Sequence, residues 1–198
     1  MLIERKTELK AEDILPVDAF EARRKEFQAE LRQHKAHRRV DVGPFCSVYF
    51  ESYFTMWWQV QEMLRVERGG DEQLADELAA YRPLVPGGRN LTATMMIEIE
   101  DPVRRDRELS TLGGIEETVS LVIGGETVKG QADDDVDRTS ADGKASSVHF
   151  FSFPLSDAQA AAFKSGDAEI QLRIGHKNYN HIAVLSADQV SSLAGDLD

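Results

Sequence analysis

Three histidines in the second half of the chain have the spacing of a candidate metal site. His176 and His181 flank a short polar stretch that predicts a β-hairpin, with both imidazoles facing each other across it. His149 lies in the apolar segment 148–153 and supplies a third nitrogen if that strand neighbours the hairpin. Three nitrogen ligands with an open position suit zinc or non-haem iron. The simpler interpretation is a polar surface turn and a half-buried histidine bonded to the backbone.

A basic cluster at the end of the first predicted helix is a second candidate site. It contains His34, Lys35, Arg38 and Arg39. Cations are favoured at a helix C-terminus by the helix dipole, which is sufficient to explain the cluster. The functional alternative is an anion site, in which a planar guanidinium grips a carboxylate or phosphate.

A helix predicted from its apolar spacing carries the third group of candidates, Gln61, Glu62, Arg65 and Glu67. Gln61 and Glu62 lie four and three residues before Arg65, so both can contact it on a helix. One interpretation is an internal ion-pair network that fixes this helix to the sheet. The other is a ligand pocket walled by Trp57 or Trp58.

The elements that must position these residues follow from periodicity and turn signals. Strands are expected over 91–100, 118–123, 126–129, 148–153, 170–176 and 181–185, with an extended segment over 40–50 that breaks at Gly43-Pro44. Apolar and polar residues alternate over 91–100, and Gly124-Gly125 predicts a two-residue hairpin turn. Helices are expected over 18–33, 53–68, 72–80, 103–112 and 156–164 and after Ser186. Asp18 with Glu21 and Ser156 with Gln159 form predicted capping boxes, and Ser186 with Gln189 is expected to cap the last helix. A polar loop is expected over 133–144.

Two predicted hairpins and an irregular alternation of strands and helices indicate an α+β fold rather than a doubly wound one. We expect a mostly antiparallel sheet, strongly curved or barrel-like, with helices packed on one face and at the ends. Residues 1–13 are expected to form a flexible N-terminal leader and residues 14–198 a single domain.

Composition limits the function classes. The 198 residues carry a net charge of −12, with +2 in residues 1–40 and −14 in residues 41–198. This acidic body argues against a dedicated nucleic-acid-binding protein. A single cysteine, Cys46, permits no intrachain disulfide, and no signal-peptide or membrane-spanning pattern is visible. We therefore expect a cytoplasmic protein with no membrane partner; whether it forms a homodimer is left open.

Several segments together resemble an uncharacterised bacterial family, domain-of-unknown-function family 3501. The resemblance is carried by residues 34–44, by the 59–68 segment, by 81–86 and 91–98, and by the segments around His149 and His176. It implies a genetic association with rubrerythrin-like di-iron proteins and iron–sulfur oxidoreductases, and hence a redox or oxidative-stress role.

Two functional hypotheses follow. The first is a cytoplasmic accessory or binding protein of a redox system, which docks a protein partner or a small anionic ligand through the basic cluster and the 59–68 helix. The second is a metalloprotein, with His149, His176 and His181 as ligands of zinc or iron and with Glu62 or Glu67 as a further ligand or base. Haem ligation by one histidine is a variant of the second hypothesis. Neither hypothesis decides whether the protein is an enzyme.

Overall fold

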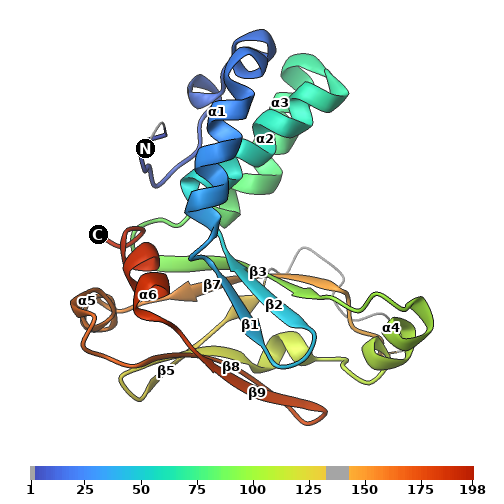
Figure 1. Ribbon diagram of the computed structural model, residues 1–198, viewed down its shortest axis with the longest axis vertical. Helices are drawn as coiled ribbons and strands as arrows, with labels where there is room; N and C mark the ends of the chain where they lie inside the picture. Colours follow the sequence, from blue (N-terminus) through green and yellow to red (C-terminus); the bar gives the residue numbers. More distant parts are fainter. Residues whose placement is uncertain (1–2, 133–142) are drawn as a thin grey trace.

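A computed structural model of the chain describes residues 3–132 and 143–198 (Figure 1). Its strands form two antiparallel sheets. The first sheet has the order β1-β2-β3-β7-β6, with bounds Arg39–Val42, Cys46–Phe50, Asn90–Ile97, Val148–Pro154 and Gln131–Ala132. The second has the order β5-β4-β8-β9, with bounds Glu126–Lys129, Val119–Ile123, Ile170–His176 and Tyr179–Val184.

The α+β class and the antiparallel pairing are therefore as predicted. The barrel-like closure is not supported, because the strands divide into two separate sheets. The inward faces of the two sheets share one apolar core, and strand β8 shows the alternation that this requires, with Ile170, Leu172 and Ile174 buried. Strand β1 lies beside β8 and β9, so this edge of the first sheet is covered by the second.

The hydroxyl of Tyr179 joins the two sheets at this edge. It donates to the carbonyl oxygen of Val42 (2.6 Å) and accepts from the backbone N–H groups of Phe45 (3.2 Å) and Cys46 (3.1 Å). Gly43 turns the chain here with a φ of 73°, and a Cβ at this position would lie 2.6 Å from the Tyr179 hydroxyl. The Gly43-Pro44 break is thus a tight turn that only glycine fits.

A helical layer stands at one end of the sheets and has an apolar cluster of its own (Figure 1). It comprises α1 (Val17–Lys35), α2 (Tyr53–Glu67) and α3 (Gly70–Tyr81). Aromatic rings join α1 to α2: the Trp57 ring lies edge-on to Phe20 and Phe27 at centroid distances of 5.8 and 5.0 Å. Such edge-to-face pairs add to the area that the rings bury.

Residues 3–13 run along this helical layer. Leu9 is fully buried in its apolar cluster, and the carbonyl oxygen of Leu9 accepts from Nε of Arg82 (2.8 Å). The indole N–H of Trp57 donates to the carbonyl oxygen of Asp13 (2.9 Å), at the end of the short 3-10 helix η1 (Ala11–Asp13).

The shorter helices α4 (Pro102–Leu109), α5 (Asp157–Ser165) and α6 (Ala187–Ala194) lie around the sheets (Figure 1). Capping boxes open α5 and α6, at Ser156 and Ser186, where the sequence predicts them. The predicted Asp18–Glu21 box is wrong, because α1 begins one residue earlier, after Pro16, without a side-chain cap. Proline suits this position because its missing N–H needs no partner there.

The two predicted hairpins are present, with one correction of register. Gly124-Gly125 forms the two-residue turn of β4 and β5, as predicted. In the second hairpin the turn is Lys177-Asn178, so His176 lies opposite Tyr179 and His181 lies opposite Ile174. The two histidines are therefore diagonal neighbours on one face, not a directly facing pair.

Most of the predicted polar loop, residues 133–142, lies outside the described residues. Two further short 3-10 helices, η2 (Arg82–Leu84) and η3 (Ile115–Thr118), precede β3 and β4. No helix within residues 3–132 and 143–198 is long and apolar enough to cross a membrane.

Candidate functional site

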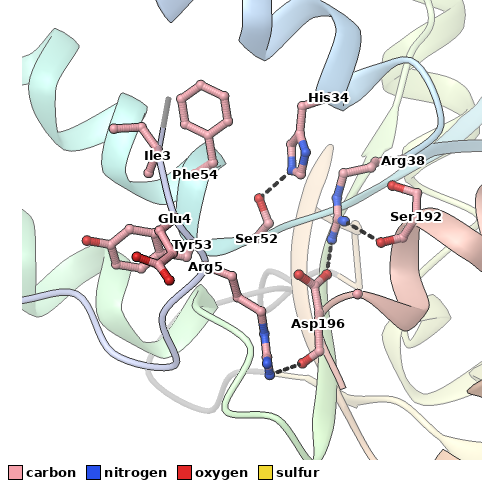
Figure 2. A pocket seen from close by; sticks show the side chains of 11 residues that line it. Ile3, Glu4, Arg5, His34, Arg38, Ser52, Tyr53, Phe54, Ser192 and Asp196 are labelled. Carbon is pink, nitrogen blue, oxygen red and sulfur yellow. Dashed lines mark hydrogen bonds and ion pairs between the residues drawn. The ribbon is translucent and has the colours of Figure 1, made fainter. Parts of the chain in front are cut away.

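Arg38 lies at the junction of the helical layer and the first sheet, where α1 ends and β1 begins. Its side chain is only 2% exposed. Nε donates to the carbonyl oxygen of Phe50 (3.0 Å), Nη2 donates to that of Glu51 (2.6 Å), and Nη1 donates to that of Ser192 (3.3 Å). The guanidinium also forms an ion pair with the buried carboxylate of Asp196 (Figure 2). All of these contacts are with other groups of the protein, so the guanidinium of Arg38 points inward and not towards solvent.

Asp196 is fixed from a second side by the N-terminal segment. Arg5 donates to the backbone oxygen of Asp196 (2.7 Å; Figure 2) and forms an ion pair with Asp198 (2.9 Å). Burial raises the pKa of Asp196, and the positive charge of Arg38 opposes this effect. Beside this ion pair lies a small cavity of about 200 Å³, which His34, Ser52 and Tyr53 also line.

His34 occupies the wall of that small cavity. Its Nε2 shares a hydrogen bond with the hydroxyl of Ser52 (2.8 Å), and its ring lies 5.6 Å from that of Phe54 (Figure 2). Burial, with the charges of Arg38 and Lys35, lowers the pKa of His34 to about 4. The ring is therefore neutral at pH 7, and His34 contributes no positive charge to the basic cluster.

The other two residues of the basic cluster face outward. Arg39 donates to Asp41 (2.8 Å) and Ser47 (2.9 Å) and lies 3.3 Å from Glu98 on the outer face of the first sheet. Lys35 is exposed, with its ammonium 5.9 Å from the centre of the Tyr49 ring. The cluster is thus divided between an inward Arg38 and His34 and an outward Lys35 and Arg39.

The charged residues of α2 form an ion-pair network with α1. Both carboxylate oxygens of Glu62 accept from Arg24 on α1 (2.6 and 3.0 Å), and Oε2 also accepts from Arg65 one turn further along α2 (3.1 Å). These positive charges lower the pKa of Glu62 against the opposing effect of its burial. The geometry is that of an internal ion-pair network, but the network joins α2 to α1 and not, as expected, to the sheet.

The two remaining candidates on α2 differ in burial. Gln61 is 1% exposed, and neither its oxygen nor its nitrogen has a hydrogen-bond partner in the described part of the chain. Glu67 is exposed and accepts a hydrogen bond from Gln73 of α3 (3.0 Å). Glu62, Arg65 and Glu67 line none of the cavities described here.

The three candidate metal ligands come from both sheets. His149, on β7, is buried; its Nε2 donates to the carbonyl oxygen of Ser146 (2.9 Å), and its Nδ1 lies 4.0 Å from a carboxylate oxygen of Glu116. His176, on β8, accepts from the N–H of Asn178 (3.3 Å) through Nδ1. His181, on β9, packs edge-on against Tyr179, with ring centres 4.4 Å apart.

Across the ranges 3–132 and 143–198, no group of three or more histidine, cysteine, aspartate and glutamate side chains is arranged to hold a metal ion. The three candidate histidines, Glu62 and Glu67 all lie within these ranges, so they do not form a metal-binding group in this structure.

A larger cavity of about 510 Å³ lies between the outer face of the first sheet and the helical layer. Its volume falls within the range of about 300–1,000 Å³ that is usual for small-molecule sites. Four aromatic side chains line it, together with Met56 and Met96: they are Tyr49, Trp58, Tyr81 and Phe150. Lys35 and Glu51 are the charged residues of its lining.

Glu51 is the polar centre of this cavity. Its Oε1 accepts from the hydroxyl of Thr94 on β3 (2.7 Å), and its Oε2 accepts from the hydroxyl of Thr55 on α2 (2.7 Å). Nη2 of Arg38 donates a hydrogen bond to the backbone oxygen of Glu51. Glu51 forms no ion pair with a lysine, arginine or histidine within the described residues. Sequence reasoning missed this residue; the only local signal was a lone carboxylate between a strand and the Ser52 cap.

Comparison with known proteins identifies the family of the chain. The family described as "Protein of unknown function (DUF3501)" matches residues 8–197. The chain belongs to the DUF3501 family. A crystal structure of a protein of unknown function from Burkholderia pseudomallei shares 38% sequence identity with it, with a TM-score of 0.88 over 96% of this chain and 100% of that chain. No curated protein matches this DUF3501 chain.

The burial of Arg38 predicts a large loss of stability when it is replaced. Arg38→Ala leaves Asp196 and three carbonyl oxygens without their donor, and loss of one partner from a buried ion pair costs about 3–5 kcal/mol. Arg39→Ala removes an exposed side chain and is expected to cost less than about 1 kcal/mol. Urea denaturation of the two variants measures the difference. Equal, small losses would contradict the structural role of Arg38.

The low pKa of His34 predicts a pH dependence of stability. The unfolded chain binds a proton at His34 near its ordinary pKa of 6.5, whereas the folded protein binds it only near 4. The free energy of unfolding is therefore fully retained above pH 6.5 and falls as the pH is lowered towards 4.

His34→Gln should reduce this fall, because glutamine does not titrate. His37→Gln is the matched control, since His37 is exposed at the end of the same helix. Denaturant unfolding at pH 7, 5.5 and 4.5 gives the slope for each protein. A slope for His34→Gln equal to that of the wild type would show that another group carries the dependence.

Proposed function

We propose that this chain is a cytoplasmic accessory protein of a redox or oxidative-stress system and that it binds a small organic ligand in the larger cavity. The observation that carries the ligand-binding part is the Glu51 carboxylate, fixed by two threonine hydroxyls in a cavity with aromatic walls. Binding sites for small molecules combine an apolar lining with a few fixed polar groups in this way.

The location of the cavity supports the same proposal. Its walls come from α1 and α2, from the end of α3 and from three strands, β2, β3 and β7. Side chains held on regular elements keep their positions better than side chains on loops, which lowers the entropic cost of binding. The site is therefore preorganised for one ligand shape.

The redox part of the proposal rests on the family resemblance and on the outward residues of the basic cluster. Lys35 and Arg39 both lie near the Tyr49 ring, with distances of 5.9 and 5.4 Å to its centre. Asp41 and Glu98 pair with Arg39 on this surface, so a partner would engage Lys35 and compete for Arg39 with an anionic patch of its own; we propose a rubrerythrin-like or iron–sulfur partner in this role. A zinc or iron centre is not part of the proposal, because residues 3–132 and 143–198 bring no three ligating groups together.

A neutral fluorescent probe tests the ligand-binding part. N-phenyl-1-naphthylamine is expected to bind at one saturable site and to quench Trp58 by energy transfer, because Trp58 lines the cavity. Met96→Trp fills the cavity and should abolish this binding, whereas Val184→Trp, at an exposed position on β9, should not. Non-saturable binding, or equal binding to both variants, would refute the cavity as a ligand site.

Sedimentation velocity of a mixture with a purified rubrerythrin-like protein tests the redox part. A faster-sedimenting complex is expected, and Arg39→Glu should weaken it by reversing the surface charge. Arg107→Glu is the matched control, since this arginine is exposed on helix α4 and pairs with Glu108 rather than with a residue of the basic cluster. No complex in the wild type, or the same loss with both variants, would contradict docking through this surface.

A further inference from the structure

The carboxylate of Glu51 has an unusual electrostatic setting for a half-buried acid. Two neutral hydroxyl donors hold it in place, and within the described residues no cation is paired with it. Partial burial weakens its hydration and strengthens its field in the cavity, because the effective dielectric constant is lower there than in water. Each carboxylate oxygen can accept more than one hydrogen bond, so both retain acceptor capacity beyond the threonines.

The aromatic walls of the cavity, like Glu51, favour a positively charged ligand. Tyr49, Trp58, Tyr81 and Phe150 present aromatic rings, which pack against flat apolar groups and whose faces attract cations. Cations of the protein already lie near two of these rings, Lys35 and Arg39 near Tyr49 and Arg24 near Trp58, which leaves Tyr81 and Phe150 without such a contact among the described cation–ring pairs. The hydroxyl of Tyr81 also accepts from the amide of Gln59 at the cavity wall (3.4 Å). Aromatic rings with one fixed carboxylate are a suitable setting for an organic cation.

Lys35 is the one opposing charge in the lining. Its side chain is exposed at the end of α1, so water and salt screen its ammonium. Glu51 is half-buried at the end of β2 and is screened less. The balance between the two groups therefore favours a cation placed next to Glu51.

From these observations we infer that the cavity selects a small organic cation, an ammonium or amidinium group carried on a flat apolar body. The cationic group donates hydrogen bonds to Glu51, and the apolar body packs against the aromatic walls. This inference rests on the proposed ligand-binding function and specifies the class of its ligand.

Benzamidine and benzamide test the inference on the wild-type protein. They have nearly the same shape, but benzamidine is a cation at pH 7 and benzamide is neutral. In displacement of N-phenyl-1-naphthylamine at low salt, benzamidine is expected to bind about tenfold more tightly, which corresponds to about 1.4 kcal/mol. Equal affinities, with the fluorescent probe still bound, would overturn the cation inference and leave the ligand site standing.

Variants identify the group that recognises the cation. Glu51→Gln keeps the shape and removes the charge, so the preference for benzamidine should disappear. Glu98→Gln is the matched control, because Glu98 lies on the same face of the first sheet but does not line the cavity. Lys35→Met should increase the affinity for benzamidine two- to threefold by removing a like charge, an estimate of about 0.5 kcal/mol for a screened pair.

The outcomes separate the two proposals. A preference for benzamidine that persists in Glu51→Gln would overturn the inference, because another group would then recognise the cation. If Glu51→Gln does not fold, Thr94→Val and Thr55→Val replace it, and each should reduce the preference by loosening the carboxylate. Failure of the probe, benzamidine and benzamide alike to bind the wild type would overturn the proposed ligand-binding function itself.

Discussion

The buried guanidinium of Arg38 is the interaction on which the arrangement of the two layers depends. It donates to the carbonyl oxygens of Phe50 at the end of β2, of Glu51 just before α2, and of Ser192 in α6. It also pairs with the carboxylate of Asp196, which follows α6. A buried charge is tolerated only when such partners replace its lost hydration. The orientation of the helical layer relative to the first sheet is therefore tied to a single side chain and its five donor groups.

This constraint also determines where the larger cavity forms. Arg38 holds the backbone oxygen of Glu51, and the threonines hold its carboxylate, so the residue is fixed at both ends. The cavity lies next to this fixed point, between α1, α2 and the outer face of the sheet. The helices in turn keep their relative position through the Phe20, Phe27 and Trp57 rings and through the Arg24–Glu62 ion pair.

Local pattern predicted much of the fold and little of the site. The strand expected at residues 91–100, the Gly124-Gly125 turn and the caps at Ser156 and Ser186 depend on neighbours in sequence, and the structure contains them, with the strand ending at Ile97. The apolar–polar alternation of this strand does not become an alternation of burial, because Thr92 and Thr94 are buried as well. The hairpin register at His176 was wrong because a shift of the turn by one residue leaves the composition of the strands unchanged. The burial of Arg38 could not be predicted, since Asp196 lies 158 residues away and the local sequence around Arg38 is that of an exposed basic cluster.

The separation between Arg38 and Asp196 also has a consequence for the order of folding during synthesis. A ribosome releases the chain from the N-terminus, so α1, α2 and α3 emerge long before Asp196. Throughout that interval the guanidinium of Arg38 has no buried counter-ion, and hydration favours keeping it in water. The helical layer can acquire its own apolar cluster early, but its docking onto the first sheet is completed only when α6 and Asp196 arrive. The order of synthesis therefore predicts a stage in which the helices are formed and the larger cavity is not.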